Sequence, residues 1–181
     1  EEDAILKAWE EFASSLLPAA KAMNKAALRN HARRMLRTII QDLQHPQTPE
    51  QQQRKSWGLA PDPSHPTAAT SHGSVRLFDG FSITEMVSEF RALRASVIKL
   101  WSSAHRLEEN DIEDLIRFNE AIDQAVAESV FSYSNEKEHQ TRLFDTMLTA
   151  SPDHLYIIDL NGGLVYANKA MADLLGMSSK A

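Results

Sequence analysis

Five basic residues of this sequence carry side chains that could form a binding site. They are His31, His72, Arg76, Arg91 and Arg94. Histidine and arginine donate hydrogen bonds from planar groups, so several of them around one space could hold a small anion or another polar metabolite. The hypothesis is that these donors converge on the apolar stripes of expected helices. We therefore predict a ligand-binding pocket at these five residues.

Arg94 shows the main alternative to a ligand site. At about 100° per residue it falls between Ile83 and Val87 in projection, inside the apolar stripe of its helix. A buried guanidinium is unfavourable without a partner, so Arg94 must meet a carboxylate, a carbonyl group or a bound anion, or extend outwards to solvent. A structural ion pair, with Glu89 or with an acid on another helix, is favoured over a bound anion.

Three histidines, His31, His72 and His105, raise the further hypothesis of a haem or metal sensor. A core histidine satisfied by a hydrogen bond is the commoner case, and no histidine and acid show the spacing of metal ligands. We therefore predict no metal site and no cofactor, and the haem or metal sensor is the least favoured alternative.

Catalytic residues are not predicted. The sequence has no glycine-rich phosphate loop, no zinc-protease motif and no nucleophile motif. The segment from His139 to Leu143 is superficially similar to the phosphoacceptor segment of a histidine kinase, but it lacks the acidic residue after the histidine and the later proline. We predict that His139 is an exposed linker histidine and that this part of the protein is not an enzyme by itself.

Apolar residues at spacings of three and four predict a chain made mostly of helices. The expected helices cover residues 3–17, 21–44, 49–56, 67–77, 83–101 and from about 110 onwards. Ser82 and Glu85 form a capping box that should start the helix at Ile83. Gly73 lies inside a helix, which is explained if another helix crosses closely there. A proline-rich connection precedes the helix that contains Gly73. Within this connection, Trp57 is expected to hold the chain onto the bundle.

The last helix carries an apolar seam that continues past the bundle. At heptad spacing the seam reaches Glu136, Gln140, Leu143 and Met147. This pattern predicts a connector helix that pairs with a second copy as a weak two-stranded coil, with a solvated linker helix as the alternative. From Ser151 the pattern alternates, which predicts two strands at 154–159 and 164–167, a tight turn between them and a helix after them.

The order of these motifs resembles a known family. The matching stretches are His31-Ala32, Leu36, Lys55-Ser56, Gly58, His72-Gly73, Arg76, Gly80-Phe81-Ser82, residues 89–97, Leu100-Trp101 and residues 117–125. They are similar to the helical N-terminal input domain of bacterial sensor histidine kinases, which is related to the N-terminal domain of RsbR-type stressosome proteins. The resemblance covers most of residues 1–134 and implies a globin-like helical fold without haem. Residues 151–176 closely resemble the opening of a PAS domain.

Composition narrows the class of protein. The net charge of −6 argues against a general binder of nucleic acid or of anionic membranes. The chain has no cysteine, hence no disulfide and no cysteine metal site. There is no apolar run long enough to cross a bilayer and no signal-peptide pattern, so we expect a cytoplasmic location without membrane insertion. A basic face at Arg29, Arg33, Arg34 and Arg37 is expected to be solvated or to meet an acidic helix.

Together these patterns predict an all-α helical bundle with a long C-terminal connector helix and a short β-hairpin. We expect a helical input domain at 1–134, a connector at 135–150 and the N-terminal fragment of a PAS domain at 151–181. The expected function is signal input and homodimerisation for a two-component sensor histidine kinase, with an unidentified small molecule or protein as the signal and with PAS and kinase domains downstream. The alternative is a protein-interaction scaffold of stressosome type with no small ligand.

Overall fold

The computed structural model describes residues 2–16, 25–59, 66–104 and 109–177. Its elements are α1 (Glu2–Leu16), α3 (Lys25–Gln44), α4 (Pro49–Ser56), α5 (Ala68–Phe78), α6 (Ile83–Ala104), α7 (Glu109–Ala150), β1 (Tyr156–Ile158), β2 (Leu164–Ala167) and α8 (Lys169–Leu174). The described part is all-α apart from one two-stranded antiparallel sheet, which confirms the predicted fold class. The expected helix starting at residue 21 lies partly outside the described residues, as does His105.

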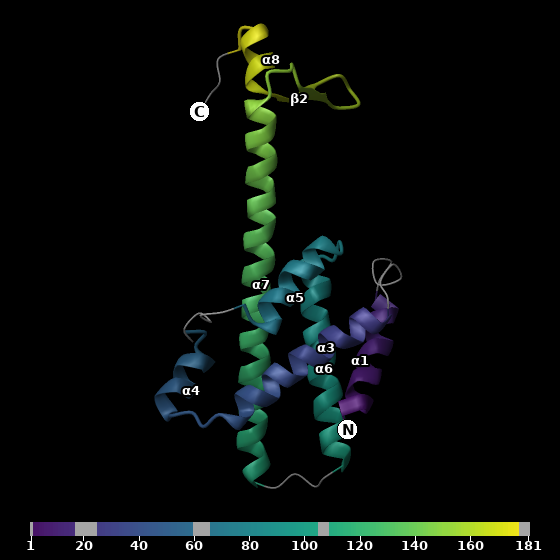
Figure 1. The fold of residues 1–181 in the computed structure, drawn as a ribbon, viewed down its shortest axis with the longest axis vertical. Helices are drawn as coiled ribbons and strands as arrows, with labels where there is room; N and C mark the ends of the chain where they lie inside the picture. Colours follow the sequence, from purple (N-terminus) through teal and green to yellow (C-terminus); the bar gives the residue numbers. More distant parts are fainter. Residues whose placement is uncertain (1, 17–24, 60–65, 105–108, 178–181) are drawn as a thin grey trace. The chain divides into compact units, whose positions relative to one another are not determined.

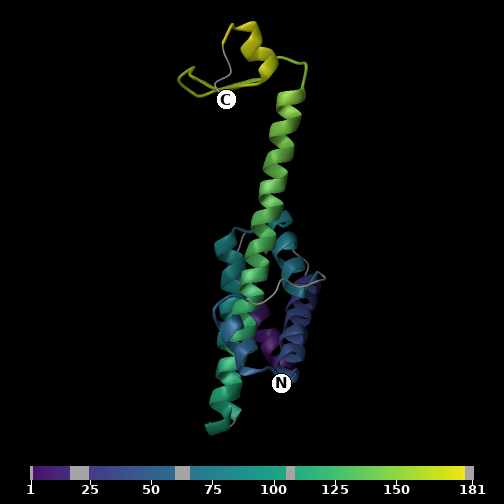
Figure 2. The same cartoon turned by 90° about the vertical axis from the view of Figure 1, so that its left-hand side faces the viewer.

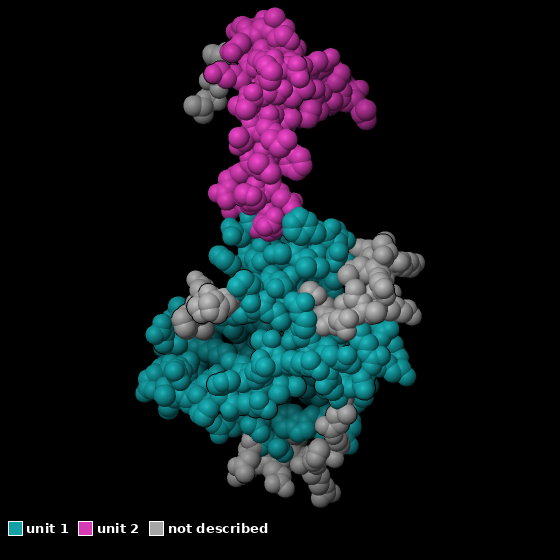
Figure 3. Space-filling view, in the orientation of Figure 1, with its two compact units in different colours: residues 1–135 teal, residues 136–181 magenta. Residues whose placement is uncertain are grey.

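Two compact units divide the chain, residues 1–135 and residues 136–181 (Figure 3). The first unit holds α1, α3, α4, α5, α6 and the N-terminal part of α7. Within it, α3, α5 and α6 lie beside α7 (Figures 1 and 2). Both α1 and α5 pack on α3 and on α6. The globin-like arrangement of these helices stays a prediction.

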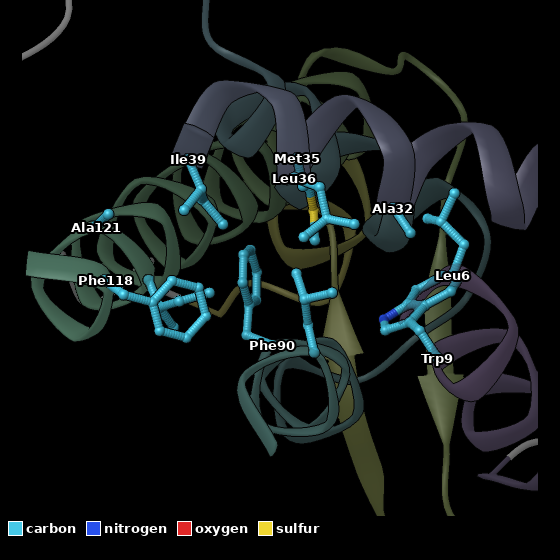
Figure 4. Close-up of a cluster of buried hydrophobic side chains, with 11 residues drawn as sticks. Leu6, Trp9, Ala32, Met35, Leu36, Ile39, Phe90, Phe118 and Ala121 are labelled. Carbon is cyan, nitrogen blue, oxygen red and sulfur yellow. The ribbon is translucent and has the colours of Figure 1, made fainter. Parts of the chain in front are cut away.

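A cluster of buried hydrophobic side chains forms the core of the first unit. It draws on four helices: α1 supplies Leu6 and Trp9, α3 supplies Ala32, Met35, Leu36 and Ile39, α6 supplies Phe90 and Leu93, and α7 supplies Phe118, Ala121 and Ile122. The labelled side chains of the four helices point towards one another in Figure 4. Full burial of a large apolar side chain contributes about 1.5–3 kcal/mol, so this cluster is the main force that holds the four helices together.

The start of α6 has the capping box that the sequence predicts. The backbone N–H of Ser82 donates to Oε2 of Glu85 at 2.8 Å, and the backbone N–H of Glu85 donates to Oγ of Ser82 at 3.3 Å. These two bonds satisfy N–H groups that a helix leaves without partners at its first turn. The capping box therefore sets where α6 begins, and with it the position of every side chain that α6 carries.

Gly73 lies where α5 and α7 cross. A Cβ atom at this position would stand 2.1 Å from the backbone oxygen of Ser129, so no larger residue fits without moving a helix. Two hydrogen bonds hold the crossing together. Oγ of Ser129 donates to the carbonyl of Ala69 at 2.7 Å, and the hydroxyl oxygens of Ser74 and Ser132 are 2.8 Å apart. The predicted close approach at Gly73 is confirmed.

The expectation for Trp57 is wrong, because its side chain is 66% exposed. The helix before it, α4, has no buried residue. Polar pairs connect α4 to the bundle instead: Lys55 bonds to Asp42 of α3, and Ser56 bonds to Glu120 of α7. Since these pairs already hold the connection, the indole ring is not needed as an anchor.

The second unit contains the hairpin and a short helix. β1 pairs with β2, with Tyr156 opposite Ala167 and Ile157 opposite Tyr166. Asn168 links these parts, because its Oδ1 accepts from the N–H of Leu155 at 3.1 Å and from the N–H of Met171 at 3.0 Å, which caps α8. The predicted hairpin and the helix after it are therefore present.

Candidate functional site

Three polar side chains lie buried between α5 and α6. His72, Arg76 and Glu89 each have an exposed fraction of 0%. Arg76 donates from Nε to Oε2 of Glu89 at 2.8 Å and from Nη2 to Oε1 at 2.9 Å. Nε2 of His72 lies 3.0 Å from the same Oε2. One carboxylate therefore meets both basic side chains, and we call these three residues the buried polar cluster.

Aromatic and acidic neighbours complete the surroundings of the cluster. The guanidinium carbon of Arg76 lies 4.6 Å from the ring centre of Phe81, a distance suited to a cation–π interaction. The rings of His72 and Phe90 meet edge to face at 5.2 Å. Nη1 of Arg76 also donates to Asp79 at 3.3 Å. The charge of Arg76 is thus balanced by residues of α5, of α6 and of the loop between them.

The protonation states of the cluster follow from burial and from neighbouring charge. Burial lowers the pKa of His72, and the positive charge of Arg76 acts in the same direction, while Glu89 only partly opposes them. His72 is therefore neutral at pH 7. Burial alone would raise the pKa of Glu89, but its contacts with His72 and Arg76 hold that pKa below the ordinary value. Since His72 is neutral, Arg76 supplies the positive charge that keeps Glu89 ionised.

Two of the five predicted ligand residues, His72 and Arg76, come together in this cluster. The carboxylate of Glu89 occupies the place beside them where the sequence predicts a bound anion. The cluster therefore satisfies its donors with an anion from the chain itself. Its direct structural effect is to fasten α5 to α6.

The other three predicted ligand residues lie elsewhere. Arg94, on α6, forms an ion pair with Asp123 of α7, which confirms the favoured interpretation of an acid on another helix. Arg91 is exposed, and His31 belongs to α3, with its side chain outside the described residues. Arg94 and Asp123 therefore join α6 to α7, while the buried polar cluster joins α5 to α6.

Glu89 is the member of the buried polar cluster that sequence reasoning did not place there: it was one of two possible partners for Arg94, and its partner is Arg76. A signal for its burial was present. Glu89 stands three residues after Met86 and four before Leu93, both fully buried on the same stripe of α6. A carboxylate in such a position requires a buried basic partner.

α7 is the element to which α3, α5 and α6 are tied. The hydroxyl of Tyr133 donates to the carbonyl of Phe81 at 2.8 Å, beside the buried polar cluster. Nη2 of Arg117 donates to the carbonyls of Leu43 at 2.7 Å and of His45 at 2.8 Å, at the end of α3. With the crossing at Gly73, these bonds connect α3, α5 and α6 to α7. These bonds are the contacts through which α3, α5 and α6 meet α7.

One face of α7 changes from buried to exposed along the helix. Phe118, Ile122, Ser129 and Tyr133 are buried on this face within the first unit. The same helical repeat continues to Gln140, Leu143, Phe144 and Met147 in the second unit. There Leu143, Phe144 and Met147 are 53%, 65% and 61% exposed. We call residues 135–150 of this helix the connector and this apolar stripe the connector face.

Neither a metal centre nor a membrane span is found in the described part of the chain. No three histidine, cysteine or acidic side chains there could hold a metal ion together. Among the described helices, none combines the length and the apolar character that crossing a membrane requires.

Comparison with protein families decides the classification. Residues 3–146 match the family described as the RsbT co-antagonist protein rsbRD N-terminal domain. The chain belongs to this family. Residues 142–181 match the PAS domain family. No curated protein and no solved structure is a significant match.

The RsbRD N-terminal domain thus spans the first unit and continues into the connector. The two family matches overlap at residues 142–146, which lie on α7 and include Leu143 and Phe144. Both families are signalling domains, so this chain is a signalling module of stressosome type followed by the start of a PAS domain. The expected resemblance to both is confirmed.

Proposed function

We propose that this chain is the signal-input and homodimerisation module of a cytoplasmic bacterial sensor histidine kinase. Residues 1–134 receive the signal, residues 135–150 connect, and residues 151–181 begin the PAS domain that passes the signal towards the kinase. The connector face carries this proposal. This face is buried in the first unit, and its apolar side chains are exposed along the connector. A second copy that covers the connector face would explain this exposed apolar stripe.

The structure suggests how the relay would work. The buried polar cluster and Tyr133 tie the α5–α6 pair to α7, and α7 reaches the first residues of the PAS match without a break in its helix. A ligand or partner that favours a different packing of α5 and α6 would shift the population of α7 arrangements. In a dimer the change would appear as a different register or crossing angle of two connectors.

Single cysteines test this arrangement directly, because the chain has no cysteine of its own. Leu143→Cys and Met147→Cys place thiols on the connector face, where paired connectors bring identical positions within disulfide distance. Asp145→Cys is the matched control, because it lies on the opposite side of the same helix. Under mild oxidation the first two variants should form covalent dimers and the control should not. Equal crosslinking at all three positions would argue against a specific coil.

A second candidate function is a protein-interaction scaffold without a small ligand. It is favoured by the description of the matched family, which names an RsbT co-antagonist. Part of the basic face is engaged within the chain, since Arg29 pairs with Asp3 at 2.8 Å and Arg33 with Glu2 at 3.0 Å. Light scattering at low and high salt separates the candidates. A scaffold should form large assemblies that salt dissolves, whereas the input module should remain a dimer.

A further inference from the structure

A cavity of about 210 Å³ lies in the first unit, between α3, α4, α5 and α7. Its apolar part includes Met35, Ile39, Ala69 and Ala121, which are 2%, 3%, 3% and 5% exposed. Two alanines among these residues leave the volume that larger side chains would fill. The cavity is separate from the buried polar cluster, which contributes none of its lining.

Polar side chains line the rest of the cavity, and they are not equivalent. The ammonium of Lys55 bonds to the carboxylate of Asp42, so these two charges balance each other. Glu128 accepts from the hydroxyl of Thr67 at 2.6 Å and from the amide of Gln124 at 2.9 Å. Both of these donors are neutral. Among the described residues, Glu128 therefore has hydrogen-bond partners but no cationic partner.

The volume sets the size of an occupant. A cavity of about 150 Å³ lined by apolar side chains holds one benzene molecule, and a water molecule takes up about 30 Å³. The 210 Å³ found here thus accommodates a ring or a branched chain of that size together with a short polar arm. The apolar lining suits the body of such a molecule, and the carboxylate of Glu128 suits a positively charged end.

We propose that this cavity binds a small organic cation, whose ammonium group donates to Glu128 and whose apolar body contacts Met35, Ile39 and Ala69. Such a ligand would touch both helices at the α5–α7 crossing. Glu128 precedes Ser129, which bonds to the carbonyl of Ala69. The further statement that this molecule is the input signal rests on the proposed function, whereas binding itself does not.

Three probes of similar size and different charge test the site. They are 2-phenylethylamine, 2-phenylethanol and phenylacetate, titrated into the 181-residue chain by calorimetry at pH 7. The amine should bind most tightly, the alcohol about tenfold more weakly and the carboxylate not measurably, because a charge-assisted hydrogen bond is stronger than a neutral one and Glu128 repels an anion. Absence of amine binding up to about 10 mM, a concentration that detects millimolar dissociation constants, would overturn the proposal.

Variants show whether the molecule sits at this site. Glu128→Gln keeps the size of the side chain and should weaken amine binding about tenfold or more, while Glu113→Gln, an exposed acid on the same helix, should leave it unchanged. Ala121→Leu should fill the cavity and abolish binding. Ala121 also belongs to the hydrophobic core, so the helix content and melting temperature of this variant are measured alongside. Undiminished amine affinity in Glu128→Gln would refute the site.

The connector crosslinks separate this proposal from the proposed function. Amine binding that leaves the crosslinking of Met147→Cys unchanged would support the site and count against its role as signal input. Specific crosslinks without any amine binding would support the dimeric input module and refute the site alone.

Discussion

Replacing Glu89 by glutamine should strongly destabilise the first unit. The change removes the negative charge that Arg76 meets through two hydrogen bonds of 2.8 and 2.9 Å, in a place where both side chains are 0% exposed. Arg76 would then keep its charge, since an arginine does not lose its proton in a protein. The buried guanidinium would then meet a neutral amide oxygen in place of the Glu89 carboxylate, and the contact with Asp79 at 3.3 Å would remain.

The expected loss of unfolding free energy follows from the burial of both side chains. Removing one partner of a buried ion pair costs about 3–5 kcal/mol, and the lower end applies here because glutamine keeps one acceptor oxygen. For a unit of this size, each kcal/mol lowers the melting temperature by about 3–4 °C. We therefore expect Glu89→Gln to melt roughly 10 °C below the unaltered chain.

Thermal melting followed by circular dichroism measures this effect, with Glu113→Gln as an exposed control that should change the melting temperature little. The double variant Arg76→Met with Glu89→Leu should be more stable than Glu89→Gln, because it removes both buried charges together. A melting temperature for Glu89→Gln within about 2 °C of the unaltered chain would refute the reasoning, since that difference corresponds to less than 1 kcal/mol.

Three further outcomes are expected. Because the pKa of His72 is lowered in the folded chain, the unfolded chain protonates this histidine at a higher pH, so stability is full above about pH 6.5 and falls below it. A further loss is expected as the pH falls below the ordinary pKa of Glu89. Melting curves from neutral to acid pH should show both steps, and His72→Gln should remove the first. Gly73→Ala should cost about 1–3 kcal/mol in urea unfolding, because its Cβ would lie 2.1 Å from the oxygen of Ser129; unchanged stability would contradict the close crossing. Ser82→Ala should cost about 1 kcal/mol and speed amide exchange in the first turn of α6, and an unchanged exchange rate would show that the cap is dispensable.

Local signals in the sequence were enough to predict most elements of the fold. Ser82 and Glu85 lie three residues apart, so their capping box depends on the geometry of one helical turn alone. The face of α7 that contains Phe118, Ile122 and Tyr133 is likewise a property of one helical repeat, and those residues are buried. Gly73 gave a longer-range signal, because a glycine inside a helix needs a packing reason.

Pairings between distant residues were harder to predict. The sequence shows that Arg76, Arg94 and Glu89 fall near apolar stripes, but the choice of partner depends on how α5, α6 and α7 cross. The structure pairs Arg76 with Glu89 and Arg94 with Asp123, which are 13 and 29 residues apart. Those crossings are set by the whole core, so periodicity in one helix could not predict them.

The cavity beside Glu128 could not be predicted for a related reason. Its lining includes alanines of α5 and α7, Ala69 and Ala121, and nothing in the periodicity of either helix shows that these two residues border one space. For Trp57 the error is the opposite one: the sequence predicted that this large aromatic residue anchors the connection to the bundle, whereas Lys55 and Ser56 anchor it through polar pairs. In both cases the missing information is the position of α4 and α5 against α7.

Native mass spectrometry of residues 1–181 tests most directly whether this chain is a dimeric input module. We predict a dimer that becomes a monomer when Leu143 and Met147 are both replaced by aspartate, because two charges on the connector face would repel their copies in the partner. A monomer of the unaltered chain at micromolar concentration would contradict the account. A dimer that survives both substitutions would show that the connector face is not what joins the copies.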